Sequence, residues 1–266
     1  MAQVFWRTAV TLLNHAPCKQ LEDDCGMAPA LLMQRLAMID WAMACEELTM
    51  QGNFVIHNLL TTEACQAMSS AFVKDKIFSR RILLEQQGLG RGEAKYFNSA
   101  PAEPVTSLRE IMYKHLSPIA TKWSAATKSD VRYPAELASY ARRSSAGQAL
   151  PLSSISRYIE GDYEGVHQDS DGETIFPLQM AILLSRPKHD FEGGEFVMTE
   201  QRPRMQSRPL ALVLQQGDAV IFATSYRPFT GTNGIYRVSL RHGVSRVRSG
   251  ARFGLSIVFH DGNSMG

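Results

Sequence analysis

The stretch Ser153 to Asp169 reads SSISRYIEGDYEGVHQD and contains the features that decide the fold. Its first part, Ser153 to Ile159, is a short run of β-type residues, and Gly161-Asp162 then provide a turn. The stretch ends in His167-Gln168-Asp169. Because successive side chains of a strand alternate between its faces, an imidazole and a carboxylate two residues apart point to the same side. The stretch therefore predicts β-structure with two potential ligands that converge.

Downstream of this stretch the same pattern repeats. Short β-type runs, separated by Gly, Pro and Asp, occupy Leu178 to Leu184, Glu195 to Thr199, Leu210 to Leu214, Ala219 to Ala223, Ile235 to Leu240 and Phe253 to His260. With Ser153 to Ile159 and a segment around His167, they make about eight strands. Eight short strands closed by turns favour a double-stranded β-helix, the cupin-like jelly roll.

Upstream, the pattern is mainly helical. Apolar residues recur at helical spacing from Pro29 to Met50 and from Val105 to Trp123, and Thr61-Thr62-Glu63 begins another helix that runs to about Val73. Asn53 to Ile56 is a short predicted strand between them. We therefore expect helices to dominate the first 145 residues. The predicted fold class is mainly β with helical support, a jelly roll flanked by N-terminal α-helices.

This pattern divides the chain into three parts: a helical N-terminal extension (1–50), a helical support region (51–150) and a jelly-roll core (151–266). The run Gly88, Gly90, Gly92 lies in the support region. Because no strand is predicted to lead into it, it indicates a flexible loop and not a phosphate-binding turn.

Composition excludes several classes of protein. Of the 266 residues, 44% are hydrophobic and 20% charged, as in ordinary globular proteins. The apolar runs are too short to span a bilayer and no secretion signal is evident, so we expect a cytoplasmic protein with no membrane contact. Cys18, Cys25, Cys45 and Cys65 match neither a zinc knuckle nor a redox pair, which indicates reduced thiols without a catalytic role.

The net charge of +2 gives no overall field for nucleic acid, but the charges are unevenly distributed. Residues 151–200 carry ten acidic and three basic side chains, whereas residues 201–266 carry nine arginines and two acids. Arg202, Arg204 and Arg208 belong to this basic part. They are expected to form a solvated loop paired with the acidic segment, or alternatively to contact an anionic substrate.

A third ligand for the His167 and Asp169 pair is available in His242. It lies in the predicted strand Tyr236 to Gly243, 73 residues after Asp169. Two histidines and one carboxylate form the facial triad of non-haem iron oxygenases, which leaves three metal positions open. Arg252 follows ten residues later, and arginine is suited to a two-pronged grip on a carboxylate. The triad with this arginine is far more specific than the HxD tripeptide alone.

These residues lie within longer blocks that resemble one family. Arg157-Tyr158 with Gly161, FEGGEF at 191–196, GDAVIF at 217–222 and Arg241-His242-Gly243 are similar, in this order, to Fe(II)/2-oxoglutarate dioxygenases of the prolyl-4-hydroxylase-like group. GNFVIHNLLTTEACQAM at 52–68 resembles the start of such domains. EFVMTEQRPRMQSRP (195–209) and YRVSLRHGVSRVRSG (236–250) are similar to a bacterial branch of generic 2-oxoglutarate and iron oxygenases.

The resemblance implies an enzyme whose catalytic core is residues 151–266. His167, Asp169 and His242 would be the catalytic iron ligands, and Arg252, Tyr158 and Ser256 would bind the cosubstrate. Ser256 is included because Gly254 stands where many relatives have the serine. The implied cofactors are Fe(II), 2-oxoglutarate and O2, with ascorbate as reductant. The implied reaction hydroxylates an unactivated C–H bond of a small molecule or peptidyl residue, while 2-oxoglutarate is decarboxylated to succinate and CO2.

Two alternatives remain beside this hypothesis. One is a nucleic-acid demethylase of the same fold, but DNA-dealkylating relatives have a further arginine where this chain has Val258, which argues against nucleic acid as partner. The other is a catalytically weak jelly-roll sensor or binding protein, although a mere binder has no need of three metal ligands and an anchor. Asp169 itself argues against halogenation, since halogenating relatives have Gly or Ala there. The fold alone implies no particular substrate and no oligomeric state.

Overall fold

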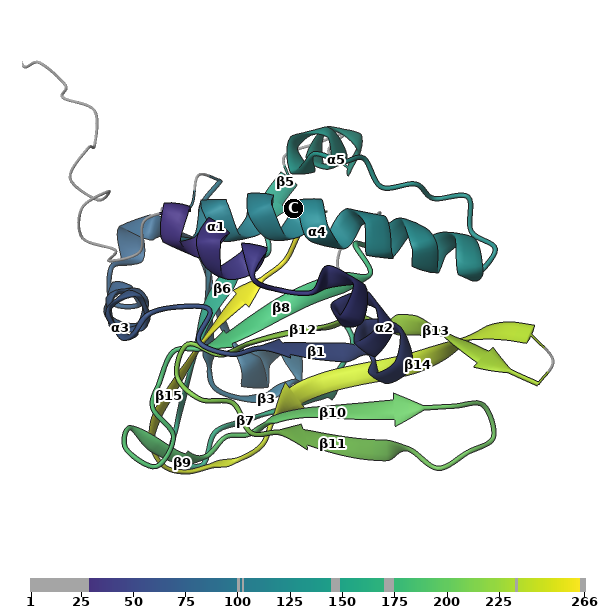
Figure 1. Ribbon diagram of the computed structural model, residues 1–266. Coiled ribbons are helices and arrows are strands. Elements are labelled where there is room, and N and C mark those ends of the chain that lie inside the picture. The colour runs from purple at the N-terminus through teal and green to yellow at the C-terminus, as the bar shows by residue number, and fades with distance from the viewer. Residues whose placement is uncertain are drawn as a thin grey trace, which may run out of the picture.

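The computed structural model describes residues 29–99, 101, 103–144, 149–169, 175–232 and 234–263. Two antiparallel sheets dominate it (Figure 1), and side chains from both line a common cavity. The larger sheet has the strand order β1-β12-β8-β15-β6-β4-β2, with β9 paired to β15. The smaller sheet has the order β11-β10-β14-β7-β3, with β13 beside β14. This architecture confirms the predicted fold class, a mainly β jelly roll with helical support.

The strands of the larger sheet are β1 (Asn53–Ile56), β2 (Phe78–Leu83), β4 (Glu93–Phe97), β6 (Ser154–Ile159), β8 (Leu178–Leu183), β9 (Phe191–Gly193), β12 (Ala219–Ala223) and β15 (Val247–Ile257). Those of the smaller sheet are β3 (Gly90–Arg91), β7 (Tyr163–His167), β10 (Phe196–Gln201), β11 (Arg208–Leu212), β13 (Tyr226–Gly231) and β14 (Gly234–Val244). A separate pair is formed by β5 (Ala149–Pro151) and β16 (Asp261–Asn263).

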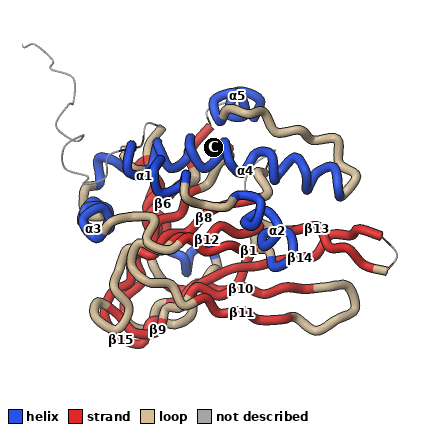
Figure 2. Tube along the Cα trace, in the orientation of Figure 1, coloured by secondary structure: helices blue, strands red, loops and turns tan. Residues whose placement is uncertain are grey.

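The helices are α1 (Pro29–Ala37), α2 (Trp41–Gln51), α3 (Thr62–Ala71), α4 (Val105–Ala126) and α5 (Leu137–Ser144), with the 3-10 turns η1 (Asp75–Ile77) and η2 (Leu84–Gln87). Figures 1 and 2 show α1, α4 and α5 on the side of the larger sheet, whereas β10 and β11 form the opposite side of the molecule. Of the helices in the described part of the chain, none is long and apolar enough to cross a membrane.

Helix α4 supports the larger sheet from outside. It buries one face, which includes Leu108, Met112 and Leu116, and burial of each such side chain stabilises the fold by about 1.5–3 kcal/mol. Arg109 of α4 donates from Nε to the carbonyl oxygen of Val258 at 3.0 Å and forms an ion pair with Asp261 at 2.9 Å. The helix is therefore fastened to the chain that leaves β15.

One prediction for the N-terminal half is wrong, and another is incomplete. The helix expected from Pro29 to Met50 is interrupted, because the Asp40 carboxylate accepts hydrogen bonds from the backbone N–H groups of Ala42 and Met43 and so caps a new helix, α2. Helices do dominate the described residues up to 145, as predicted, but β2 and β4, which were not predicted, lie between residues 78 and 97 and extend the larger sheet. They escaped prediction because β4 buries two charged side chains, Glu93 and Lys95, on the face opposite to Ala94 and Tyr96, which line the cavity.

The glycine run expected to be a flexible loop is part of the barrel. Gly90 lies in β3 and pairs with Glu164 of β7. Gly92 has φ +144° and sits so close to Tyr158 that a Cβ there would come within 2.8 Å of its ring. These glycines allow the chain to pass directly against the strands that carry the functional residues.

Candidate metal centre

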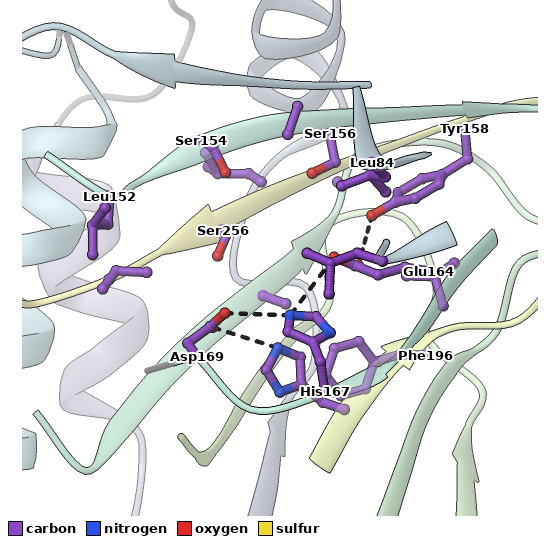
Figure 3. Close-up of a pocket in the computed structure, with 18 of the residues that line it drawn as sticks. Leu84, Leu152, Ser154, Ser156, Tyr158, Glu164, His167, Asp169, Phe196 and Ser256 are labelled. Carbon is purple, nitrogen blue, oxygen red and sulfur yellow. Dashed lines mark hydrogen bonds and ion pairs between the residues drawn. The ribbon is translucent and has the colours of Figure 1, made fainter. Parts of the chain in front are cut away.

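The three predicted ligands come together at one end of the cavity. His167 is the last residue of β7 and pairs with His242 of β14 across the smaller sheet. Asp169 follows two residues after the end of β7, so it does not lie on the strand as the alternation argument assumed, but its side chain still points back to His167 (Figure 3). Their potential ligand atoms all lie within 4.8 Å of one another. This is a compact N,N,O donor set.

The carboxylate of Asp169 lies between the two imidazoles. One oxygen is 3.3 Å from Nε2 of His167, and the other is 3.6 Å from Nε2 of His242. The other ring nitrogen of His167, Nδ1, donates a hydrogen bond to the carbonyl oxygen of Gly165 at 3.0 Å. This hydrogen bond leaves Nε2, which faces Asp169, as the nitrogen available to a metal.

Burial and charge have opposite effects on the two histidines. Burial lowers the pKa of His242 to about 4, so this imidazole is neutral at physiological pH. Burial by itself would also lower the pKa of His167, but the hydrogen bond with Asp169 and the charge of Glu164 raise it to about 9. The pKa of Asp169 is held well below its usual value, because contacts with both histidines outweigh the effect of its burial. The carboxylate is therefore ionised and available as a ligand.

The ring of His242 is fixed by packing. It lies 4.6 Å from the ring of Phe222 and stacks on Phe196 at 6.1 Å, as measured between centroids. The side-chain amide nitrogen of Gln179 is 3.4 Å from Nε2 of His242. These neighbours come from β8, β10 and β12, so both sheets hold the imidazole in place.

Arg252 lies at the other end of the same cavity. Its side chain is buried, its Nε has no hydrogen-bond partner, and among the described residues no carboxylate comes within the 4.0 Å of an ion pair. Its guanidinium carbon is 5.6 Å from the centre of the Tyr158 ring. Burial lowers the pKa of Arg252, and the negative charges of Glu164 and Glu195 partly offset this effect. The guanidinium nevertheless stays charged, as arginine does in proteins. A buried cation without a partner is costly unless a ligand supplies the anion.

The remaining predicted residues line the cavity between these ends. Gly254, Ser256 and Val258 follow Arg252 along β15 and all face the cavity, whose volume is about 160 Å³. Phe253 points the other way and packs against Phe72 with ring centroids 5.6 Å apart. Ser256 therefore lies on the same face of β15 as Arg252.

A family model with the description "oxygenase, catalysing oxidative methylation of damaged DNA" matches residues 92–262, which is more than half of the chain and includes the whole metal centre. The chain belongs to this oxygenase family. Two uncharacterized proteins of Mycobacterium tuberculosis, from strains CDC 1551 / Oshkosh and ATCC 25618 / H37Rv, are each 37% identical over 176 residues, or 66% of this chain and 76% of theirs.

Among solved structures, the oxygenase chain is similar to a prolyl-4-hydroxylase from Pseudomonas putida, with a TM-score of 0.50 at 10% identity, over 81% of this chain and 96% of the other. At this identity the likeness shows the fold alone. A 2OG-Fe(II) oxygenase family oxidoreductase from Burkholderia pseudomallei gives a TM-score of 0.46 at 14% identity, over 86% of this chain and 96% of that one. The likeness to the Pseudomonas putida enzyme shows that this family member has the jelly-roll fold found in 2OG oxygenases.

Sequence reasoning missed two polar residues beside the histidines of this site: Glu164, which lines the cavity, and Gln179 behind it. Glu164 accepts a hydrogen bond from the Tyr158 hydroxyl at 2.7 Å (Figure 3) and lies 3.9 Å from Nε2 of His167. Burial raises the pKa of Glu164 against the opposing effect of His167. Gln179 is fully buried beside His242. A signal for Gln179 was present, because a glutamine inside the apolar run LQMAIL requires a polar partner.

Four further histidines of the described residues lie apart from the triad or serve the fold. His57 bonds with Asp218, His115 stacks on Trp41, and His189 bonds with Asp190. His260 lines the cavity and accepts a hydrogen bond from the backbone of Phe176. None of these belongs to the metal-ligand group found in the described part of the chain.

Two further sequence predictions concern the cysteines and the basic loop. Cys45 and Cys65 are free thiols, while Cys18 and Cys25 lie outside the described residues. Arg202 pairs with Glu200 at 2.7 Å, whereas no carboxylate of the described chain lies within 4.0 Å of Arg204 or Arg208. The expected pairing with the acidic segment therefore holds for one of the three arginines.

Proposed function

We propose that the protein is a non-haem Fe(II)- and 2-oxoglutarate-dependent dioxygenase that hydroxylates a C–H bond. One observation carries this conclusion. A single cavity has a His-Asp-His donor set at one end and a buried arginine without a counterion at the other. A dicarboxylate with a keto group next to one carboxylate suits both ends at once.

The donor set fits Fe(II). Two imidazoles and one carboxylate, close enough to share one ion, are the facial set that leaves open positions for a chelating cosubstrate and O2. The hydrogen bond from Nδ1 of His167 to Gly165 directs Nε2 toward the donor set, where a bound metal would replace its proton, and burial keeps His242 neutral. We therefore assign His167, Asp169 and His242 as iron ligands and catalytic residues.

The opposite end fits the distal carboxylate of 2-oxoglutarate. Arg252 supplies the planar pair of N–H donors that a carboxylate requires. Ser256 lies on the same face of β15, and we assign it a hydrogen bond to the cosubstrate. We assign Tyr158 to the cosubstrate site as well. Its ring packs beside Arg252 and its hydroxyl donates to Glu164, which leaves the phenol oxygen free to accept.

When bound, iron and 2-oxoglutarate would supply the oxidation: O2 is consumed, 2-oxoglutarate yields succinate and CO2, and one oxygen atom enters the substrate C–H bond, while ascorbate would only keep the iron in its ferrous state. The chain positions and shields this chemistry. Phe196, Phe222 and Leu214 line the cavity with apolar surface that excludes water. Asp169 stays ionised against its burial because both histidines contact it.

Succinate formation tests this proposal directly. Purified protein is incubated with Fe(II), ascorbate and 2-oxoglutarate, and succinate is measured over peptides, small molecules and damaged DNA as substrates. Wild-type succinate production that Asp169→Ala abolishes supports the proposal. Equal production by wild type and Asp169→Ala, or none by either, contradicts it.

The substrate class has two candidates. The sequence favoured a small molecule or a peptidyl residue as substrate. The description of the matching family instead favours the alternative, a damaged nucleobase. Val258, which replaces the additional arginine of DNA-dealkylating relatives, does line the cavity. Formaldehyde release separates the candidates, since hydroxylation of an N-methyl group leaves an unstable hemiaminal that breaks down to formaldehyde and a free N–H.

Two broader assignments belong to the same proposal. We take residues 151–266 as the catalytic core, 51–150 as its support, which includes strands β2 to β4, and 1–50 as an N-terminal extension. The cytoplasm is the proposed compartment, because the free thiols Cys45 and Cys65 suit reducing conditions.

A further inference from the structure

A second cavity lies against the arginine end of the cavity that holds the metal centre. We call it the corner cavity, because residues of β9, β15 and the segment after β11 line it where β9 and β15 meet at a corner of the molecule (Figure 1). Four residues line both cavities, namely Leu183, Phe196, Leu214 and Arg252. The wall between the corner cavity and the metal-centre cavity is therefore one residue thick.

The side chain of Arg252 crosses this wall. Its Cδ lies beside Gly194, which lines the corner cavity, and a Cβ added to that glycine would come within 2.9 Å of it. Its Nη1 lies beside Gly254, which lines the metal-centre cavity, and a Cβ added there would come within 3.0 Å. The arginine thus passes from one cavity to the other, and the two glycines leave the room that it needs.

The corner cavity opens to solvent. Lys188, Glu192 and Val213 line it and are exposed, Val213 by 78%. At the other end of the metal-centre cavity, the side chain of Asp169 is 36% exposed. The metal-ligand end and the arginine end therefore each have their own approach from solvent.

The size and charge of the corner cavity suit a small dicarboxylate. Its volume of about 320 Å³ is twice the 160 Å³ of the metal-centre cavity, so a cosubstrate that fits the second also fits the first. Glu195 lines the corner cavity, but its carboxylate accepts a hydrogen bond from the Ser245 hydroxyl instead of pairing with Arg252. The buried guanidinium is left to attract an anion, because an unpaired buried charge is costly.

We propose that the dicarboxylate cosubstrate enters through the corner cavity and that succinate leaves by the same route, past Arg252. The keto-acid end passes the arginine first and reaches the His-Asp-His set, and the distal carboxylate then stops at the guanidinium. Rotation about the several bonds of the arginine side chain opens the way. This inference rests on the proposed function, because it gives that oxygenase a separate passage for its cosubstrate.

The passage makes the exchange of cosubstrate independent of the primary substrate. A substrate that lies over Asp169 closes the approach to the metal-ligand end, whereas the arginine end stays open to the corner cavity. With a single opening at the metal-ligand end, the cosubstrate would have to bind before the substrate, and succinate would have to leave after the product. Release of products limits the turnover of many enzymes, so the route of succinate affects the rate.

A removable plug tests the passage. The variant Val213→Cys receives a bulky, uncharged label through a disulfide bond. Association and dissociation of 2-oxoglutarate with the iron-loaded protein are then followed without oxygen by stopped flow, from the visible absorption of the chelate. The label should lower both rates at least about tenfold and leave Kd unchanged, because a plug alters the path and not the bound state. A reductant that removes the label should restore both rates.

Met205→Cys with the same label is the matched control, since Met205 is 56% exposed in the turn between β10 and β11 and lines neither cavity. Wild-type protein treated in the same way gives the contribution of the native cysteines. Equal rates in the two labelled variants overturn the proposal. Faster dissociation from labelled Val213→Cys overturns it too, because a plugged exit cannot speed release.

Unlabelled wild-type protein is measured in parallel. If it forms no chelate with iron and 2-oxoglutarate, the proposed function is contradicted, and the passage with it. A chelate that forms and dissociates at the same rates with and without the plug contradicts the passage and leaves the proposed function untouched.

Discussion

His167 and His242 face each other across adjacent antiparallel strands, with ring centroids 4.6 Å apart. This pairing fixes two nitrogen donors through backbone hydrogen bonds of the smaller sheet, while Asp169 is added from the segment that follows β7. The metal centre therefore depends on the strand register, since a shift of one residue would turn one imidazole to the outer face.

The first prediction concerns metal binding. Alanine at His167, Asp169 or His242 should lower Fe(II) or Co(II) stoichiometry to near zero, because each removes one of three ligands, while the barrel stays folded. Metal content after dialysis and circular dichroism measure both properties. His189→Ala, which removes an exposed histidine, is the control. Full metal content in one of the three variants would exclude that residue from the site.

The second prediction concerns the cosubstrate. Arg252→Lys and Arg252→Gln should raise the apparent dissociation constant of 2-oxoglutarate at least tenfold, or about 1.4 kcal/mol, because both lose the planar fork. The measurement is calorimetric titration at fixed metal. Arg248→Lys, an exposed position on the same strand, should bind like the wild type. If all three variants bind alike, another residue anchors the cosubstrate.

The third prediction concerns thiol reactivity. Burial raises the pKa of Cys65 to about 12, so at pH 8 almost none of this thiol is the reactive thiolate. Iodoacetamide should leave Cys65 unmodified in the folded protein and modify it in urea. Peptide mapping by mass spectrometry distinguishes it from the half-buried Cys45, which should react first. Rapid alkylation of Cys65 in the native state would show that α3 opens easily.

The fourth prediction concerns acid stability. Glu93 is buried, which raises its pKa, but Arg81, Arg157 and Lys95 outweigh this effect and the pKa is lowered overall. A lowered folded-state pKa means that Glu93 stabilises the protein above its unfolded pKa, near 4.3, and that this contribution is lost as the pH falls through the folded value.

Glu93→Gln should therefore lower the free energy of unfolding by about 2 kcal/mol at pH 7, and the difference from the wild type should shrink below about pH 4. Urea unfolding at pH 7, 5 and 3.5 measures it. Glu192→Gln, on an exposed position of β9, is the control. A difference that stays constant with pH would show that the carboxylate charge is not what stabilises β4.

The sequence was sufficient to predict candidate site residues where a polar or charged residue interrupts a short run of β-type residues. His167, His242 and Arg252 lie in short β-type runs, and the structure brings His167, Asp169 and His242 together as predicted, although Asp169 lies beyond the end of β7 where strand alternation does not apply. Most strands downstream of residue 150 were located within a few residues of their bounds.

Elements whose character depends on distant partners could not be predicted. β4 buries Glu93 and Lys95, and this is favourable only because Arg81, Arg157 and Asp75 lie beside them in the folded chain. Glu164 likewise gains its role from Tyr158 on another strand. An analysis of hydrophobic periodicity assigns charged residues to the surface, so it cannot predict charged pairs that are buried.

The position of β15 has a consequence for the order in which the protein is made. It is the last long strand of the chain, yet it pairs with β6 on one side and β8 on the other, near the middle of the larger sheet. A growing polypeptide that has reached β14 already contains all three metal ligands but has two halves of a sheet with a gap between them. During synthesis the larger sheet can therefore close only after residues 247–257 leave the ribosome, so the wall of the cavity that carries Arg252 is completed late.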